Sequence, residues 1–439
     1  MREKSRLLFG TLIVFLLAFS FIPGCLDKEA DEEEEEEDDQ HLPIPENLID
    51  PADLVYLGAF RLPESSGTGP EGNTWSWGGS SMTYYPGGDP EGPDDGYPGS
   101  IFGTGLDQYQ YVSEISIPAP VISTGKDLTE LNTAGTLQDF VDIRQGLFGE
   151  LELPRVGLEY LPKQGGQSED KLYFTWGQHM QELESGPSHG WFDLDLSDPD
   201  RAGPWSLEGQ IKYNITDYIF EIPSNWAAEN TPGYRLATGR FRDGGQGTLG
   251  PSLIAYGPWN QGDPPAKNSA LPNTPLIMYS SVYDDPGAER ALNGYHHSDE
   301  WSGGSWLTTE DKAAVIFVGM KGQGDCWYGF QDGTVWPEEP PFPPEGPGER
   351  GWWSDSWIAQ IIFYDPDDLA AVASGQMEPY EPQPYATLNI NDLLWNRPTD
   401  EIRPFGAVSF DRERGMLYAF EFRGDPETDN PLVHVWRVA

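Results

Sequence analysis

One pattern constrains the fold more than any other: short, strand-like segments recur through residues 48–439, each bounded by Gly, Pro, Asp or Asn. They are rich in β-branched and aromatic residues, as in "SMTYY", "KLYFTWG", "AAVIFVGM" and "MLYAFEF". Such runs between turn residues are typical of β-strands. Helical spacing occurs only over Thr136 to Ile143 and in a short segment that begins at Asp365, and neither is long enough to cover a parallel sheet. The sequence therefore predicts an all-β domain.

Internal similarity favours one all-β architecture. A Gly-led strand followed by a second apolar strand returns along the chain, with leading glycines at positions 79, 157, 250, 304 and 406. Repeated units of this kind are typical of propeller blades, and their irregular spacing predicts large insertions between strands. A domain of this length is also too long for one ordinary sandwich. We therefore expect a β-propeller of five to seven blades, with seven slightly preferred.

The two ends of this domain carry strands that could close such a ring. The segment "VYLGAFRL" precedes the first repeat, and the chain ends in "PLVHVWRVA". An N-terminal strand that pairs with the C-terminal blade would remove the open sheet edge that invites aggregation. We expect this pairing.

Several segments resemble a group of secreted or lipid-anchored, propeller-like proteins of largely uncharacterised function. They are "WSWGGSSMTYYP", "YVSEISIPAP", "WSGGSWLTTEDKAAVIFVGMKGQGDCWYG", "RPFGAVSFDRERGMLYAFEF" and "VHVWRV". These motifs consist of glycines and aromatic residues with structural roles. The resemblance therefore implies the propeller fold and no established chemistry.

The N-terminus predicts export and lipid anchoring. Basic residues precede an apolar stretch shorter than a bilayer span, which ends in Ile22-Pro23-Gly24-Cys25. We interpret residues 1–24 as a lipoprotein-type signal peptide and Cys25 as the lipidated residue. Residues 25–47, which include nine consecutive acids, are expected to form an acidic, disordered tether. Residues 48–439 would then lie outside the cytoplasm, at the cell surface.

Charge narrows the classes of partner. The chain has 26 basic and 72 acidic residues and a net charge of −46. The signal segment carries +2 and residues 27–39 carry −10, so −38 belongs to residues 40–439. Such an excess opposes contact with phosphate backbones, so we expect no nucleic-acid partner. The membrane would be reached through the lipid on Cys25, and no oligomeric state is predicted.

Ligands of a propeller usually meet loops from several blades at one mouth of the central channel, so candidate residues are scattered in sequence. Titratable residues that follow strands are the natural choices. A base and cations for glycan chemistry could come from His, Tyr, Arg and Lys side chains. The candidates for catalysis are His179, His297, Tyr328, Arg240 and Lys321.

Motifs for other chemistry are weak. The one compact histidine and carboxylate cluster spans residues 296–300, and adjacent histidines on a strand point to opposite faces, so we predict no metal site. The acidic turns "GGDPEGPDDG" and "YDDPG" could hold calcium but lack EF-hand spacing. Cys326 is expected to be a buried, inert thiol. Asn214 begins a sequon that permits glycosylation.

Aromatic residues in loops suggest the ligand. Flat rings beside glycines suit the apolar faces of sugars. The predicted ligand-binding residues are Trp301, Trp327, Trp353 and His189. We therefore expect a lipid-anchored propeller that binds extracellular glycan or another polar ligand at the channel mouth. A polysaccharide lyase or glycoside hydrolase on the same fold, and a structural protein of the cell envelope, are the alternatives.

Overall fold

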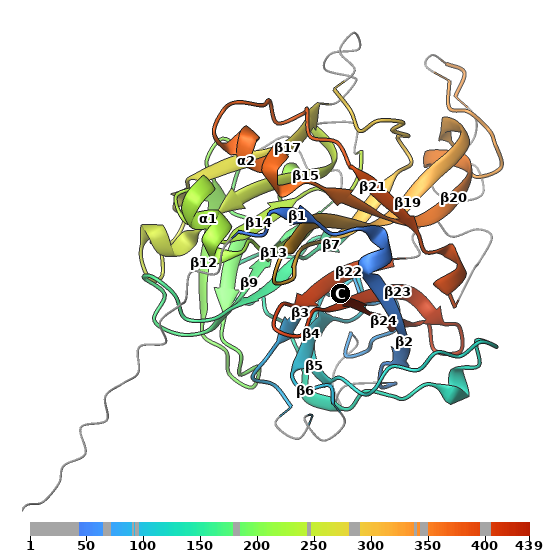
Figure 1. The fold of residues 1–439 in the computed structure, drawn as a ribbon, viewed down its shortest axis with the longest axis horizontal. Coiled ribbons are helices and arrows are strands. Elements are labelled where there is room, and N and C mark those ends of the chain that lie inside the picture. The colour runs from blue at the N-terminus through green and yellow to red at the C-terminus, as the bar shows by residue number, and fades with distance from the viewer. Residues whose placement is uncertain are drawn as a thin grey trace, which may run out of the picture. The chain divides into compact units, whose positions relative to one another are not determined.

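The computed structural model describes residues 44–64, 72–89, 92, 96–178, 185–243, 247–280, 290–337, 340–342, 350–395 and 405–439. Residues 42–439 form one compact unit. It is a five-bladed β-propeller, whose small sheets follow one another in Figure 1. The predicted fold class is therefore confirmed, with five blades where seven were slightly preferred.

One strand of each blade lies against the axis. These inner strands are β3 (Met82–Tyr85), β8 (Leu158–Leu161), β13 (Tyr218–Glu221), β18 (Glu300–Thr308) and β22 (Phe405–Asp411). Each contacts the next, and β22 contacts β3, so that the ring is closed. The backbone amide of Tyr84 in β3 donates to the Ser409 hydroxyl of β22 at 2.8 Å. We call the end where the inner strands begin the front mouth, and the end where they finish the rear mouth.

The other strands complete each blade outward. Blade 1 continues with β4 (Ser100–Thr104), β5 (Val112–Ser116) and β6 (Thr136–Val141). Blade 2 continues with β9 (Lys171–Thr175), β11 (His189–Phe192), β12 (Arg201–Leu207) and β16 (Ala270–Leu271). Blade 3 continues with β14 (Leu236–Gly239), β15 (Thr248–Tyr256) and β17 (Asn273–Ser280).

Blade 4 carries the longest strands. It contains β19 (Lys312–Gly329), β20 (Gly351–Tyr364) and β21 (Ala386–Asn389), and β1 (Asn47–Leu48) pairs in parallel with the start of β19. Blade 5 contains β23 (Met416–Asp425), β24 (Asn430–Val438) and β2 (Leu54–Arg61). A separate small ribbon joins β7 (Pro154–Arg155) to β10 (Gly177–Gln178).

The expected closure by the N-terminal strand is confirmed. β2 pairs antiparallel with β24, from Leu54 opposite Val438 to Arg61 opposite Leu432. A buried polar chain crosses this blade: the Tyr56 hydroxyl lies 2.9 Å from His434 Nδ1, and His434 Nε2 lies 2.7 Å from a Glu421 carboxylate oxygen. The closing strand is therefore held by side chains as well as by its backbone ladder.

Helices are few among the described residues. The α-helices are α1 (Ser224–Asn230) and α2 (Pro366–Ala373), and single 3-10 turns cover Pro51–Asp53, Leu128–Glu130, Lys212–Asn214, Pro258–Gln261 and Asn391–Leu393. The segment that begins at Asp365 is helical as predicted, because the Asp365 carboxylate accepts the Asp367 amide at 2.8 Å and caps α2. The prediction for Thr136 to Ile143 was wrong: Thr136–Val141 is strand β6, with Leu137 exposed and Phe140 packed on Trp75.

The repeat that we placed at Gly250 was also misassigned. Gly250 lies in β15, the third strand of blade 3, whereas the inner strand of that blade is β13. No glycine leads β13, since Asp217 and Tyr218 stand there. The glycine that makes close packing possible lies on the neighbouring strand instead: a Cβ added to Gly157 would lie 2.5 Å from the Tyr218 carbonyl carbon.

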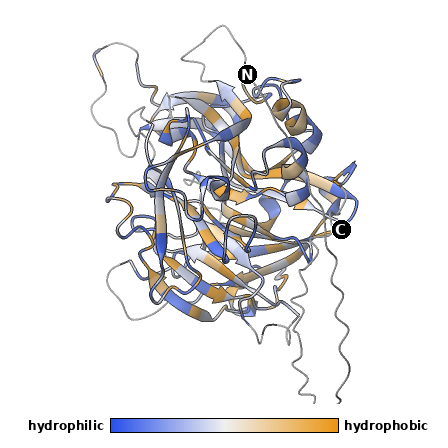
Figure 2. Ribbon diagram, turned by 90° about the vertical axis from the view of Figure 1, so that its left-hand side faces the viewer, coloured by the Kyte–Doolittle hydropathy of each residue, from blue (hydrophilic) through white to orange (hydrophobic). Residues whose placement is uncertain are grey.

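The core fills the spaces between neighbouring blades. Apolar clusters pack blade 3 on blade 4, blade 4 on blade 5 and blade 5 on blade 1, and smaller clusters complete the ring. Hydrophobic stretches lie within the strands in Figure 2. This packing fixes the inner strands and leaves the loops at the two mouths to carry polar chemistry.

Candidate functional site

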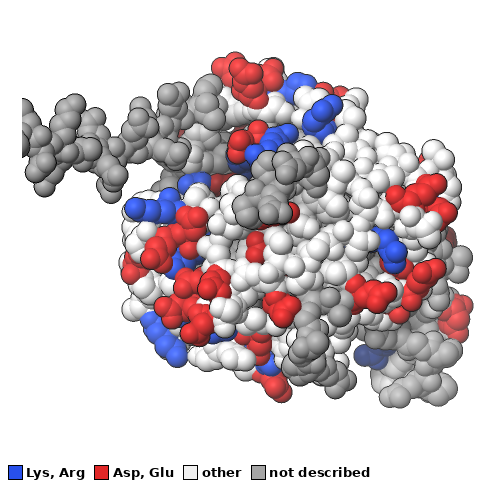
Figure 3. Space-filling model, turned by 90° about the horizontal axis from the view of Figure 1, so that it is seen from below, with Lys and Arg blue, Asp and Glu red and all other residues white. Residues whose placement is uncertain are grey.

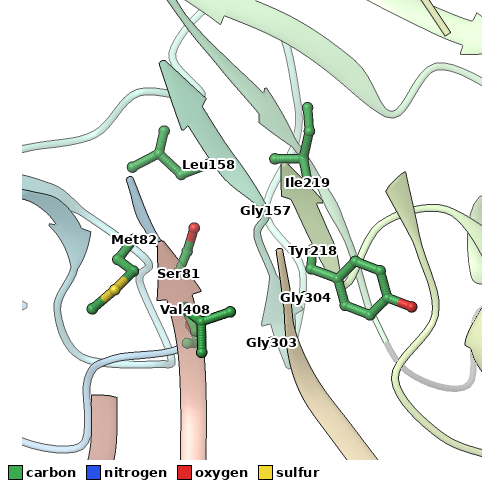
Figure 4. Close-up of a pocket in the computed structure, with 11 residues that line it drawn as sticks. Ser81, Met82, Gly157, Leu158, Tyr218, Ile219, Gly303, Gly304 and Val408 are labelled. Carbon is green, nitrogen blue, oxygen red and sulfur yellow. The ribbon is translucent and has the colours of Figure 1, made fainter. Parts of the chain in front are cut away.

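The axis of the propeller is too narrow for an organic ligand. Neighbouring blades approach closely near it: a Cβ added to Gly406 of β22 would lie 2.0 Å from the carbonyl oxygen of Gly79, which precedes β3. A cavity at the axis measures about 10 Å³ and is lined by residues in or just before all five inner strands, including Ser81, Leu158 and Val408 (Figure 4). That volume is near the minimum for one water molecule. An organic ligand would therefore not fit in this cavity.

The front mouth brings a histidine and an aspartate together from different blades. Asp243 follows β14 of blade 3, and His297 precedes β18 of blade 4. Their Oδ2 and Nδ1 atoms lie 2.5 Å apart, with the Asp243 side chain buried and 23% of the His297 side chain exposed. A carboxylate on Nδ1 orients the ring and makes Nε2 the basic nitrogen of the neutral imidazole. The pair could accept a proton or bind a hydroxyl group.

Aromatic rings surround His297. Its imidazole stacks on Trp352 with centroids 4.2 Å apart and planes 19° apart, and Tyr295 meets it edge-on at 5.5 Å. Tyr328 lies edge-on to Trp352 at 5.3 Å. Burial raises the pKa of Tyr295 well above its ordinary value, so this hydroxyl stays protonated. The result is a partly exposed cluster of aromatic rings beside a polar pair.

The rings continue along the hairpin that β19 and β20 extend beyond the sheet. We call residues 321–358 the arm; in Figure 1 its strands lie at the right, near the labels β19 and β20. Arg350 covers Trp336, with its guanidinium carbon 4.3 Å from the ring centroid, and Trp336 stacks on Phe342 at 5.2 Å. Half of the Phe342 side chain is exposed. The aromatic surface thus runs from His297 to the outer part of the arm.

Cations at the same mouth are held in pairs with acids. Arg242 Nη1 lies 2.5 Å from a Glu300 oxygen, and this pair joins blades 3 and 4. Arg155 lies 3.8 Å from Asp217 and covers the Phe241 ring. Arg240, a predicted candidate, is buried and donates to the Arg242 carbonyl oxygen at 2.6 Å. Arg240 therefore positions the loop that carries Asp243, and its side chain does not face a ligand.

The side chains of His296, Asp299 and Glu300 each bond to a side chain outside the cluster. His296 bonds to Ser354, Glu300 to Arg242, and Asp299 to Lys321 at 3.0 Å. Burial raises the pKa of Asp299 even though Lys321 opposes that shift. Lys321 thus lies at the base of the arm near His297, but its ammonium group is engaged with a buried carboxylate.

Most of the residues that we predicted to bind a ligand are buried in the interior of the domain. Trp301 is fully buried between blades 3 and 4, and Trp353 is buried with its indole nitrogen donating to Gly329. His189 is also fully buried, and burial lowers its pKa to about 3, so it is neutral. Trp327 is half-buried and bonds to the Phe330 carbonyl. Trp352, adjacent to Trp353 in sequence, is the tryptophan that stacks on His297.

Some predictions fall outside the described residues. They are His179, Cys25 with the signal and most of the tether, the turn "YDDPG" and much of "GGDPEGPDDG". In the described part of the chain, no three His, Cys, Asp or Glu side chains are placed to hold a metal. Nor does that part contain a helix long and apolar enough to span a membrane.

Two further residues are placed by the structure. Asn214 is buried, and its side-chain oxygen accepts the Thr248 amide at 3.1 Å, so the folded domain does not present it for glycosylation. Cys326, predicted to be buried, is instead a half-buried thiol, because it lies on the arm outside the apolar clusters between blades, 4.0 Å from the Ser298 hydroxyl.

The rear mouth contains a second polar network. Glu159 accepts the Glu221 amide at 3.0 Å and the Thr83 hydroxyl at 3.1 Å, and Glu221 pairs with Arg412 at 3.2 Å. Burial, with the Glu221 charge, raises the pKa of Glu159 well above its ordinary value. Burial also opposes ionisation of Glu221, but Arg412 and Arg235 outweigh it and lower that pKa. These groups are bonded to one another, and the network joins inner strands.

Of the candidates for catalysis, the structure therefore groups His297, Tyr328 and Lys321 around the front mouth and puts Arg240 beneath it. Asp243 was not predicted, although it follows strand β14 closely and a titratable residue after a strand was the criterion for the other candidates. No protein-family model and no curated protein matches this chain significantly.

Proposed function

We propose that this protein is a lipid-anchored, extracytoplasmic propeller that binds glycan at the front mouth between blades 3 and 4. One observation carries the proposal: His297 is stacked on Trp352 and fixed by Asp243 of the neighbouring blade. Such a surface offers a ring face for the apolar side of a sugar and a polar edge for its hydroxyl groups.

The arm supports a chain-like ligand. Tyr328, Trp336 and Phe342 continue the aromatic surface outward from Trp352. Consecutive sugars of one polysaccharide could contact the uncovered parts of this surface, since Arg350 and Phe342 already lie on Trp336. Acidic side chains greatly outnumber basic ones in the chain and are more abundant than basic ones on the face in Figure 3, which favours a neutral glycan over a polyanionic one.

A specific observation also favours an enzyme as the second candidate function. An imidazole held by a buried carboxylate is the arrangement of a general base. Because His297 covers one face of Trp352, a glycan would have to reach past the edge of that ring for His297 to remove a proton from it. Hydrolysis and elimination leave different products, namely new reducing ends alone or reducing ends together with an absorbing unsaturated sugar.

The test is to incubate the protein with neutral and uronate polysaccharides and to measure retention, reducing ends and absorbance of unsaturated products. We expect retention of a neutral polysaccharide, and Trp352→Ala should weaken it about tenfold because the stacking face is lost. Ile122→Ala, which removes an exposed apolar side chain far along the chain from this site, is the control. Equal retention by Trp352→Ala and the wild type would contradict the proposal.

Product formation distinguishes the two candidates. Asp243→Asn keeps the shape of the aspartate but removes the charge that sets the His297 tautomer, so an enzyme should lose most of its rate while binding persists. If polysaccharide is retained but no product forms from any of those tested, the site binds glycan and does not cleave it.

A further inference from the structure

A second aromatic group on the front side, at the junction of blades 5 and 1, has features of a binding site. Trp77 lies in the loop between β2 and β3, and 47% of its side chain is exposed. Arg423 of β23 lies over it, with the guanidinium carbon 4.1 Å from the ring centroid. The arginine covers one face of the indole.

The backbone holds this tryptophan in an unfavourable conformation. Trp77 has φ +60° and Arg423 has φ +47°, values in the left-handed region that bulky side chains rarely adopt. The alternative, glycine, would remove the strain at position 77. Backbone strain of this kind concentrates at functional sites, and here two such residues are in contact, one of them a large exposed side chain.

The surrounding structure fixes the loop firmly. The Trp77 amide donates to the Asp429 carbonyl at 2.9 Å, and its own carbonyl accepts the Asp107 amide at 3.2 Å. Two residues earlier, Trp75 is fully buried against Phe140 and Phe420. Blades 1 and 5 therefore both hold this loop in place, with the Trp77 ring exposed.

We propose that Trp77 and Arg423 form a second saccharide-binding site, which takes one sugar unit of a neutral polysaccharide. The indole supplies the stacking face, and the guanidinium supplies N–H donors for hydroxyl groups at its edge. That the ligand is a neutral glycan rests on the proposed function and on the charge of −38 on residues 40–439. The site itself shares no residue with that of His297 and Trp352.

The test follows the indole N–H signals of the full-length protein by NMR during titration with short neutral oligosaccharides. Trp77→Phe and Trp352→Phe assign the two signals. We expect the Trp77 signal to shift in a saturable manner. A shift of Trp352 alone would overturn this site and keep the proposed function, whereas a shift of Trp77 alone would do the reverse. Absence of both shifts would overturn both.

Variants separate binding from folding. Trp77→Gly removes the ring and the backbone strain together, so we expect binding of a neutral oligosaccharide at this site to weaken about tenfold or more while the melting temperature stays the same or rises. Trp77→Tyr retains a ring and should retain part of the affinity. Unchanged affinity in Trp77→Gly would contradict the site, and response to a uronate polymer alone would contradict the neutral ligand.

Discussion

At the residue scale, the rear-mouth network shows how single side chains connect blades. Thr83, Glu159, Glu221 and Arg412 belong to four different blades and bond in sequence, and Arg412 reaches the Trp306 carbonyl of the remaining blade at 3.2 Å. A protonated Glu159 beside an ionised Glu221 avoids the repulsion of two buried negative charges. The ring is therefore tied together at its axis by groups whose charge matters.

This network predicts a pH dependence of stability. Because folding raises the pKa of Glu159, its contribution to stability is complete at low pH and is lost as the pH rises through the folded-state pKa. Glu159→Gln keeps an acceptor for the Glu221 amide and cannot ionise. We expect its melting temperature to equal or fall below that of the wild type near pH 4 and to exceed it by about 2 °C at pH 8.

The matched control is Glu413→Gln, because that side chain is 75% exposed. Its difference from the wild type should change little with pH. Melting curves recorded from pH 4 to pH 9 check both variants, and a Glu159→Gln curve parallel to that of the wild type would refute the assigned protonation.

At the scale of elements, the arm behaves as an addition to blade 4. None of the described residues of the arm belongs to the apolar clusters between blades. Its own stability comes from the β19–β20 ladder, with Gly322 opposite Trp357 and Tyr328 opposite Trp352. Loss of the arm should therefore affect the ligand site more than the fold.

Replacing residues 324–355 with a two-residue Asn-Gly turn tests this division. The turn would join Gln323 to Ser356, which are opposite one another in the ladder. We expect a folded propeller whose far-ultraviolet circular dichroism is that of a β-protein, with retention of neutral polysaccharide reduced at least about tenfold. If the shortened protein binds as tightly as the wild type, the arm does not contribute to glycan binding.

Sequence reasoning succeeded where local pattern decides the structure. Strand positions, the Asp365 cap and the β2–β24 closure depend on turn residues and alternation, which the sequence displays. The site was reached only in part. His297 and Tyr328 were singled out, but the choice of Trp353 over Trp352 reverses two adjacent residues that face opposite sides of β20. One residue of register decides which ring is buried, and only the packing of blade 4 sets that register.

Asp243 and Trp77 show a second reason why the candidate sites could be predicted only in part from the sequence. Asp243 becomes significant because blade 3 lies beside blade 4, and Trp77 because its backbone is held at positive φ by Asp429 and Asp107. Both depend on contacts between segments distant in sequence.

At the scale of the whole molecule, ring closure by β2 is the feature on which the rest depends. Leu54 and Phe60 are buried by it, and Arg61 pairs with the buried Asp425 at 2.7 Å. Without β2, the edge of β24 and the interface between blades 5 and 1 would be open to water. Both mouths are assembled from neighbouring blades and would lose their geometry.

Removal of residues 1–61 should therefore destabilise the protein strongly, since burial of each large apolar side chain contributes about 2 kcal/mol. Removal of residues 1–43 is the control, because it leaves every described strand in place. We expect cooperative melting near the wild-type temperature for the shorter deletion, and aggregation or a much lower melting temperature for the longer one. Equal melting of the two proteins would show that β2 does not close the ring.

The proposed function depends on a glycan-binding surface at the front mouth. The most direct measurement is a crystal structure of the protein with a neutral oligosaccharide that it retains. We predict electron density for a sugar ring against the face of Trp352 that His297 does not cover. Well-defined sugar density only at the rear mouth, near Glu159 and Arg412, would contradict the account.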